Sequence, residues 1–303
     1  MFRITSLILR TYSHNNLIKT NLARSFSLSA IKATNMKLSE IVKKLEEFGS
    51  LHYAEKWDNV GLLVEPSNSF VDVSTIMLTN DLTQHVMDEA IAKNANMIIS
   101  YHPPIFQGLK RLTNSQWKER IIIKAIENRI SIYSPHTVWD SISNGTSEWL
   151  ANSVPNKTMK PVIPNVSNPD FGAGRVCQVD GSFSLKQVVD LVKKYTKLDD
   201  LRIGVSFTGS LDSQIKSFAC CPGSGSSVLK DVKEDIDLFI TGEMSHHEVL
   251  EANSNNIHII MLNHSNSERG YLHHFVPILA DLLKTTDVDI FVSEKDEDPL
   301  KTI

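Results

Sequence analysis

The sequence has few cysteines, no long hydrophobic run and no strong excess of charge, and each absence excludes a class of protein. Its three cysteines, Cys177, Cys220 and Cys221, do not form a disulfide framework, and the adjacent pair lacks the spacing of a zinc ribbon. No apolar stretch approaches the ~18 residues of a membrane-spanning helix. The net charge of -4 and the scattered Lys and Arg residues argue against direct nucleic-acid binding. We therefore expect structural thiols, a reducing compartment and no membrane span.

The N-terminal segment lacks acidic residues altogether. The first acidic residue is Glu40, whereas Arg and Lys recur before it among many serines and threonines. A basic, serine-rich and acid-free composition is typical of a mitochondrial transit peptide, and the continuous apolar core of a secretory signal is missing. We expect residues 1–36 to be a transit peptide or a disordered tail. Mitochondrial localisation follows from the first interpretation, and a cytoplasmic and nuclear protein from the second.

The rest of the chain reads as an α/β protein. Its 303 residues, of which 41% are hydrophobic, are enough for one large domain or two medium ones. Apolar strand patterns alternate with helical patterns, which predicts parallel strands joined by right-handed crossovers. Residues 152–175 are rich in Pro, Asn, Ser and Gly, the composition of a linker. We expect two similar lobes with mostly parallel sheets, at residues 37–170 and 171–303, and a site at their interface.

Three predicted strands end in residues that bind metals. His264 and Glu268 follow the apolar run at 259–262, and a helical turn would place both side chains on one face. His102 follows a second apolar run, and His136 with Asp140 follows a third. Ligands of open α/β sheets bind at the carboxyl ends of strands. For His102 or His136 alone, an ordinary loop residue is the simpler interpretation. The recurrence of the pattern at three strand ends favours a shared metal site.

The predicted ligands combine imidazole with carboxylate. This combination suits Zn, Mn, Fe, Co or Ni, and the absence of thiolate argues against a closed structural zinc site. Because carboxylates can bridge, we expect one or two divalent ions per chain, which would supply hydroxide near neutral pH. The predicted ligands are His102, Asp140, His264 and Glu268.

Three further residues are candidates for moving protons. Glu243 and His247 follow the predicted strand DLFIT, and His136 lies beside the predicted ligand Asp140. Such groups act as general acids or bases when they reach the reacting atoms, and a second interpretation of Glu243 and His247 is that they orient the metal ligands. An equally simple interpretation of Glu243 and His247 is a polar helix cap with one buried histidine.

The motifs WDNVGLLVE, SYHPPIF, SPHTVWD, TGEMSHH and NHSNSERGYL, in this order, resemble the NIF-three-like family, which is also described as type-two GTP cyclohydrolase I. The resemblance covers roughly residues 37–303 and is closest to eukaryotic members. It implies a dinuclear metal site between two similar lobes, with ligands at the four residues predicted above. It also implies a dimer-based homo-oligomer, often a hexamer. Bacterial members have two consecutive histidines where this chain has Tyr101 and His102.

Two functions of different classes remain open. The first is a metal-dependent hydrolase of a nucleotide or a related small molecule, with Glu243, His136 or His247 moving protons. The second is a non-catalytic oligomeric scaffold, transcriptional co-regulator or metal-handling protein that binds other proteins. Tyr101 in place of a histidine favours the second function. The cluster of polar groups at strand ends favours the first.

Overall fold

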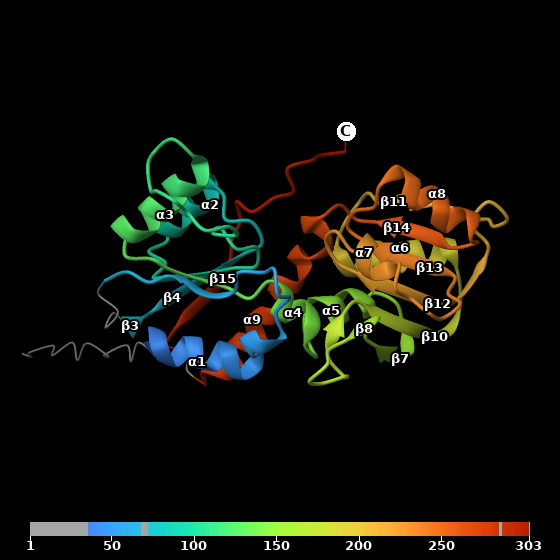
Figure 1. Ribbon diagram of the computed structural model, residues 1–303, viewed down its shortest axis with the longest axis horizontal. Coiled ribbons are helices and arrows are strands. Elements are labelled where there is room, and N and C mark those ends of the chain that lie inside the picture. Colours follow the sequence, from blue (N-terminus) through green and yellow to red (C-terminus); the bar gives the residue numbers. More distant parts are fainter. Residues whose placement is uncertain (1–35, 68–71, 285–286, 303) are drawn as a thin grey trace, which may run out of the picture. The chain divides into compact units, whose positions relative to one another are not determined.

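A computed structural model describes residues 36–67, 72–284 and 287–302. They fall within one compact unit, Thr34–Ile303, built around a five-stranded sheet and a six-stranded sheet (Figure 1). The expected transit peptide lies outside the described residues, apart from Met36. Among the described residues, no helix combines the length and apolar content that crossing a membrane requires.

The five-stranded sheet is mainly parallel. Its strand order is β15-β4-β5-β6-β2, and only the edge strand β2 runs antiparallel to its neighbour. The central strands are apolar on both faces, as expected for a sheet covered by helices on both sides. The strands in chain order are β2 (Gly61–Val64), β4 (Thr75–Thr79), β5 (Met97–Ser100), β6 (Ser131–Ser134) and β15 (Asp289–Val292).

The six-stranded sheet has a parallel centre and antiparallel flanks. Its order is β11-β14-β13-β12-β10-β7, and the parallel pairs are β14 with β13 and β13 with β12. The strands in chain order are β7 (Asn156–Lys160), β10 (Arg175–Ser184), β11 (Arg202–Gly204), β12 (Gln214–Cys221), β13 (Leu238–Thr241) and β14 (His258–Met261).

Two short strand pairs and the helices complete the described fold. β1 (Met36–Lys37) pairs with β3 (Asp72–Val73), and β8 (Ile163–Pro164) pairs with β9 (Gly172–Ala173). The helices are α1 (Leu38–Phe48), α2 (Gln84–Ala92), α3 (Trp117–Glu127), α4 (Thr137–Ser141), α5 (Thr146–Ala151), α6 (Leu185–Thr196), α7 (Ser226–Leu229), α8 (His246–Ser254) and α9 (Arg269–Leu283), with 3₁₀ turns η1 (Leu51–Tyr53) and η2 (Ser265–Ser267).

Helix α1 buries the apolar stripe that its sequence predicts. In α1, Leu38, Ile41 and Leu45 recur at spacings of three and four and are buried. Helix α8 begins with a capping box, in which Ser245 and Glu248 satisfy each other's backbone N–H groups. Local sequence therefore fixes both where these helices lie and where they begin.

One hydrophobic core contacts both sheets. Leu78 of β4 and Leu238 of β13 belong to the same buried cluster, which also includes Trp139 and Phe275. The rings of Trp139 and Phe275 lie 4.1 Å apart between centroids, so α4 and α9 pack directly on each other. Figure 1 shows α1 and α9 below the five-stranded sheet and α2 and α3 above it. This packing holds the carboxyl ends of the strands in place.

The α/β fold class is confirmed, but the structure differs from the expected linker and bears on the expected lobes. The linker interpretation of residues 152–175 is wrong in part, because β7 is the edge strand of the six-stranded sheet and pairs with β10. β15, from the C-terminal end of the chain, pairs with β4 in the five-stranded sheet. That sheet therefore combines residues from both sides of position 170. The division into lobes at 37–170 and 171–303 stays a prediction.

Candidate metal centre

Three parallel strands of the five-stranded sheet deliver polar side chains to one edge. Strands β4, β5 and β6 are neighbours and point the same way, so their carboxyl ends meet. Asp81 follows β4, His102 follows β5 and His136 follows β6. The strand residues before them are buried, at positions 76–78, 97–99 and 131–134. Polar side chains can therefore gather only from the loop positions that directly follow the strands.

The six-stranded sheet contributes in the same way. Strands β12, β13 and β14 are parallel neighbours, and Gly223, Glu243 and His264 follow them. Gly223 has a φ of 60°, and a Cβ atom there would lie 2.5 Å from Oε1 of Glu268. The close approach of this backbone to the carboxylate therefore requires glycine. His264 and Glu268 do not share an α-helical turn as expected, because the 3₁₀ turn η2 lies between them.

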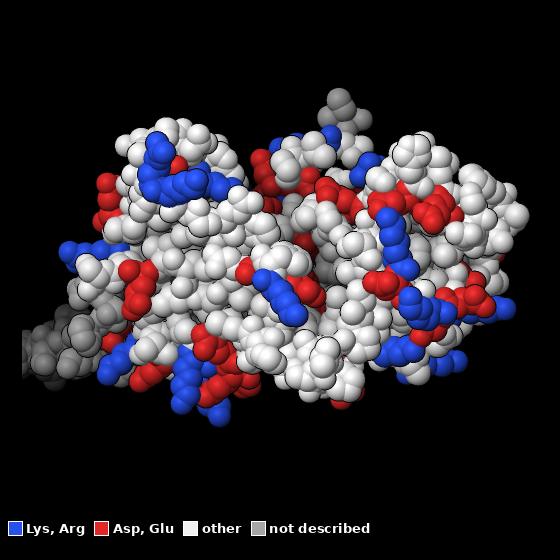
Figure 2. Space-filling model, viewed as in Figure 1, with Lys and Arg blue, Asp and Glu red and all other residues white. Residues whose placement is uncertain are grey.

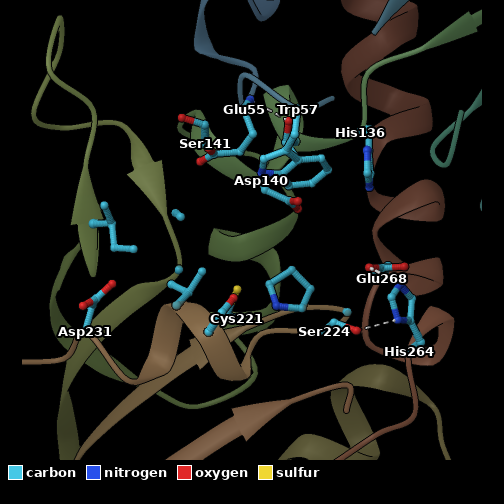
Figure 3. Close-up of a pocket in the computed structure, with 18 residues that line it drawn as sticks. Glu55, Trp57, His136, Asp140, Ser141, Cys221, Ser224, Asp231, His264 and Glu268 are labelled. Atoms are coloured by element: carbon cyan, nitrogen blue, oxygen red, sulfur yellow. Dashed lines mark hydrogen bonds and ion pairs between the residues drawn. The ribbon is translucent and has the colours of Figure 1, made fainter. Parts of the chain in front are cut away.

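His102, His264 and Glu268 form one cluster. The Nε2 atom of His102 lies 3.3 Å from Oε2 of Glu268, and the Nε2 atom of His264 lies 3.7 Å from Oε1. One nitrogen or oxygen from each residue lies within 4.8 Å of those of the other two. Figure 3 shows Glu268 and His264 side by side at one end of the cavity. Both imidazoles thus direct their Nε2 atoms at the Glu268 carboxylate.

The other nitrogen of each imidazole is held by a second carboxylate. The Nδ1 atom of His102 lies 2.8 Å from Oδ1 of Asp81, and the Nδ1 atom of His264 lies 3.1 Å from Oε2 of Glu243. An ionised carboxylate only accepts hydrogen bonds, so in each pair the Nδ1–H group donates. This arrangement fixes the ring and leaves the Nε2 lone pair of a neutral imidazole for a metal ion.

His136 repeats this pattern beside the cluster. Its Nδ1 atom lies 2.7 Å from Oδ1 of Asp58, whose side chain is completely buried. Asp58 also accepts hydrogen bonds from the backbone N–H and the hydroxyl of Thr137, at 3.1 Å and 2.5 Å. These contacts hold His136 at a φ of 31°, which is unusual outside glycine. The His136 ring lies 5.4 Å from the His102 ring.

Glu268 is buried and held in place through Asn80. The Asn80 side chain donates a hydrogen bond to Oε2 of Glu268 at 3.0 Å. The backbone N–H of Asn80 in turn donates to Asp296 at 2.5 Å, and Asp296 also pairs with Arg269 at 3.3 Å. The C-terminal segment after β15 therefore supports the cluster from behind.

Without a metal ion, a proton on the His102 imidazole balances the negative charge of the Glu268 carboxylate. Burial alone would lower the pKa of His102, but the Glu268 carboxylate and Asp81 outweigh burial and raise it to about 10. Burial alone would raise the pKa of Glu268, but the His102 and His264 imidazoles lower it. The buried Nε2 atom of His102 has no hydrogen-bond partner among the described residues. The donor set and this unpartnered nitrogen fit a divalent cation.

Asp140, the fourth predicted ligand, lies on the wall of the same cavity but outside the cluster of three. It accepts a hydrogen bond from the hydroxyl of Tyr101, which is fully buried. Burial raises the pKa of Asp140 to about 6, although the Tyr101 hydrogen bond and His136 act in the opposite direction. Tyr101 is thus hydrogen-bonded to the remaining predicted carboxylate ligand.

The predicted proton-transfer residues lie in different places. His136 lines the cavity, and Glu243 contacts His264. His247 is exposed near the start of α8, where its ring lies 5.4 Å from that of His246, and it is not among the residues that line the cavity. The assignment of His247 as a catalytic residue therefore stays a prediction without geometric support.

The cavity has a volume of about 470 Å³. Figure 3 shows Glu55, Trp57 and Asp140 along one wall and Cys221, Ser224 and His264 along the other. The lining residues are Glu55, Trp57, His136, Thr137, Asp140, Ser141, Ile163, Ala173, Gly174, Cys221, Pro222, Gly223, Ser224, Ser227, Val228, Asp231, His264 and Glu268.

The sequence patterns singled out Glu243, which orients His264, but not Asp58 and Asp81, the carboxylates that orient the other two histidines. Asp58 and Asp81 each lie within 3 Å of an imidazole nitrogen, at 2.7 Å and 2.8 Å. One signal was available for Asp81, because it directly follows a predicted strand, as His102 does. Asp58 lies inside the motif WDNVGLLVE, but nothing in its spacing points to His136, which is 78 residues away.

The chain matches known proteins over most of its length. The family model Duf34/NIF3 (NGG1p interacting factor 3) matches residues 36–299. NIF3-like protein 1 of Drosophila melanogaster is 45% identical over 89% of this chain and 90% of its own length. NIF3-like protein 1 of Homo sapiens is 36% identical, over 88% and 93%. NGG1-interacting factor 3 of Saccharomyces cerevisiae is 37% identical, over 88% and 97%.

Solved structures share the fold. The hypothetical protein SA1388 of Staphylococcus aureus superposes with a TM-score of 0.77 at 25% identity, over 89% of this chain and 100% of that one. A Bacillus cereus protein related to NIF3 gives a TM-score of 0.76 at 20% identity, over 88% and 98%. With a family model that spans residues 36–299, and relatives above 30% identity along almost their whole length, this chain belongs to the Duf34/NIF3 family.

Proposed function

We propose that this protein binds divalent metal ions at His102, His264 and Glu268, with Asp140 as a further ligand, and that it is a metal-dependent hydrolase of a nucleotide or related small molecule. One observation carries the proposal. Two Nε2 atoms converge on a buried carboxylate, while separate carboxylates hold both Nδ1 atoms. Imidazole with carboxylate suits Zn, Mn, Fe, Co or Ni, at one or two ions per chain.

The residues around the cluster have separate roles in the proposed hydrolysis. A bound divalent ion lowers the pKa of a water molecule and so supplies a nucleophile near neutral pH. Asp81 and Glu243 hold the two histidine ligands in one orientation. His136, fixed by Asp58 and facing the cavity, is placed to accept or return a proton on the substrate side. The cavity beside the cluster has room for a small-molecule substrate.

A non-catalytic role is the second candidate, and a specific contact favours it. Tyr101 stands where bacterial-type members have a histidine, and its hydroxyl donates a hydrogen bond to Asp140. This contact engages a carboxylate that a second ion would need. The yeast relative is named NGG1-interacting factor 3, so binding of other proteins is a reasonable role for a family member. The second proposal is an oligomeric scaffold, transcriptional co-regulator or metal-handling protein.

A turnover screen separates the two candidates. The protein is loaded with Zn, Mn, Fe, Co or Ni in turn and incubated with GTP and with phosphoesters, alongside a His136→Gln variant that leaves the three cluster residues intact. Hydrolysis that falls at least ~100-fold in the variant supports the hydrolase and the role of His136. Metal-loaded protein that turns over none of these compounds supports the scaffold.

Assembly and location complete the proposal. We expect a dimer-based homo-oligomer, up to a hexamer, and import into mitochondria. Sedimentation equilibrium on the full chain measures the first. A single sedimenting species with the 34.0 kDa mass of one chain would rule out the assembly.

A further inference from the structure

The cavity that His264 and Glu268 of the metal cluster line also reaches an exposed tryptophan. Trp57 lines the cavity and is 60% exposed, which is unusual for so large an apolar side chain. Its ring lies 5.9 Å from that of His136 and 6.0 Å from that of Phe106. His136 therefore lies between the indole and the His102 ring. A planar group that stacked on Trp57 would have its other end directed toward the cluster.

The charged residues that line the cavity are all acidic, apart from its histidines. Among the described residues no Lys or Arg lines the cavity, whereas Glu55, Asp140, Asp231 and Glu268 all line it. Asp140 and Glu268 belong to the metal end and are engaged by Tyr101 and by the histidines. The two others, Glu55 and Asp231, are exposed.

The two exposed carboxylates are weakly neutralised. Within the described part of the chain no ion pair involves Glu55, and Lys233 lies 3.9 Å from Asp231 with both side chains exposed. Lys230, next to Asp231 in the chain, pairs instead with Glu248 at 2.8 Å. Figure 2 shows red acidic side chains, together with a blue basic one, around the hollow near the middle of this face. Figure 3 shows Glu55 beside Trp57 and Asp231 on the far side of the cavity. Like charges that face one another across a binding surface cost free energy, so Glu55 disfavours an anion at the Trp57 end.

The remaining surface suits an uncharged or cationic ring. Ile163 and Val228 supply apolar surface, while Ser227 and Thr137 supply hydroxyl groups. An aromatic ring stacks on an indole face, and a positively charged ring gains a cation–π attraction in addition. Small-molecule sites commonly combine such an apolar wall with a few polar groups.

We propose that the end of the cavity at Trp57 binds a planar aromatic group without negative charge, stacked on the indole, with Glu55 favouring a cationic ring. The proposal deepens the proposed function, since it names a part of the substrate that does not contact the metal cluster. A nucleotide that binds here would have its base on Trp57 and its phosphates toward the cluster. The binding of the ring itself requires no metal ion.

Three compounds with the same pyridine ring isolate the effect of charge. They are 1-methylnicotinamide, a cation; nicotinamide, which is neutral; and nicotinate, an anion. Each is titrated by ligand-observed NMR against the full chain after treatment with a chelator, so that the nicotinate carboxylate cannot bind an ion. Metal content is measured separately on untreated protein, so failure of the metal proposal and failure of this one give different results.

The expected order of affinity is cation, then neutral compound, then anion. The cation is expected to bind at least ~10-fold more tightly than the anion. Trp57→Ala should weaken the binding of all three compounds, and Glu55→Gln should weaken the binding of the cation alone. Trp117→Ala is the matched control, because Trp117 is 48% exposed but does not line this cavity. Equal or tighter binding of the anion, binding unchanged in Trp57→Ala, or no binding of any of the three overturns the proposal.

Discussion

The Nε2 atom of His102 lies 3.3 Å from Oε2 of Glu268 and has no hydrogen-bond partner among the described residues. The two atoms are at ion-pair distance without hydrogen-bond geometry, and a bound cation would complete this buried nitrogen. The two residues come from different sheets, after β5 and after β14. Their approach across 166 positions of the sequence is what makes the metal centre a property of the folded chain.

The carboxylate behind His102 should tune metal affinity. Because Asp81 fixes the Nδ1–H group, Asp81→Asn leaves the ring free to rotate and to adopt the wrong tautomer. We expect metal affinity to fall about 10–100-fold, as measured by competition with a chromophoric chelator. Asp88→Asn is the control, because Asp88 pairs with Lys124 on α3, away from the cluster. Equal affinity in the two variants would show that Asp81 does not support the site.

The C-terminal segment should stabilise the site from behind. Asp296 is buried and accepts hydrogen bonds from Asn80 and Arg269. Its replacement in Asp296→Asn leaves the Arg269 charge without its partner, so we expect the free energy of unfolding to fall by about 3 kcal/mol. Urea unfolding monitored by circular dichroism measures the change.

The exposed neighbour of Asp296 provides the control. Glu297→Gln should leave the free energy of unfolding almost unchanged, since the Glu297 side chain is 71% exposed. Similar unfolding midpoints for the two variants would contradict a supporting role for Asp296.

The contribution of Glu89 to the free energy of unfolding should depend on pH. Burial would raise its pKa, but hydrogen bonds from Ser293, from Lys93 and from the backbone N–H groups of Glu294 and Lys295 lower it below 4.5. A group whose pKa is lowered on folding contributes stability above its unfolded pKa. That contribution disappears as the pH falls through the folded pKa.

We therefore expect Glu89→Gln to be less stable than the natural chain at pH 7 by about 2 kcal/mol, and the difference to narrow below about pH 4. Urea unfolding across this range measures it, with Glu127→Gln on the exposed side of α3 as the control. A difference that stays constant with pH, or grows as the pH falls, contradicts the assignment.

The N-terminal prediction is tested outside the described residues. Residues 1–40 carry no acidic residue before Glu40. A fluorescent reporter fused behind them should enter mitochondria, because import depends on a basic amphipathic segment. A fusion in which Arg3, Arg10 and Arg24 are changed to Glu should remain in the cytosol. A natural fusion that stays cytosolic removes the mitochondrial assignment.

Part of the candidate site could be predicted because strand ends are visible in sequence. Apolar runs identified β5, β6 and β14, and parallel strands bring their carboxyl ends together. This was enough to place His102, His136 and His264 in one region. The details of η2 were not visible, because a 3₁₀ turn and the start of an α-helix have similar spacing.

Other features depend on contacts between distant residues. No periodicity links Asp58 to His136 or Asn80 to Asp296, which lie 78 and 216 positions apart. β7 was interpreted as part of a linker because its segment is rich in Pro and Asn and, as an exposed edge strand, it has little apolar pattern. Such pairings are decided by packing of the whole chain rather than by local sequence.

The most direct test of the central claim is the number of divalent ions that stay bound per chain. The natural protein and Glu268→Gln are dialysed against Zn and Mn and then against metal-free buffer, and the ions are counted by mass spectrometry. We predict about one or two ions per natural chain and at least a ~100-fold lower affinity in the variant, which loses the carboxylate that both Nε2 atoms face. Less than one ion per natural chain, or the same content in both proteins, would contradict a metal centre at this position.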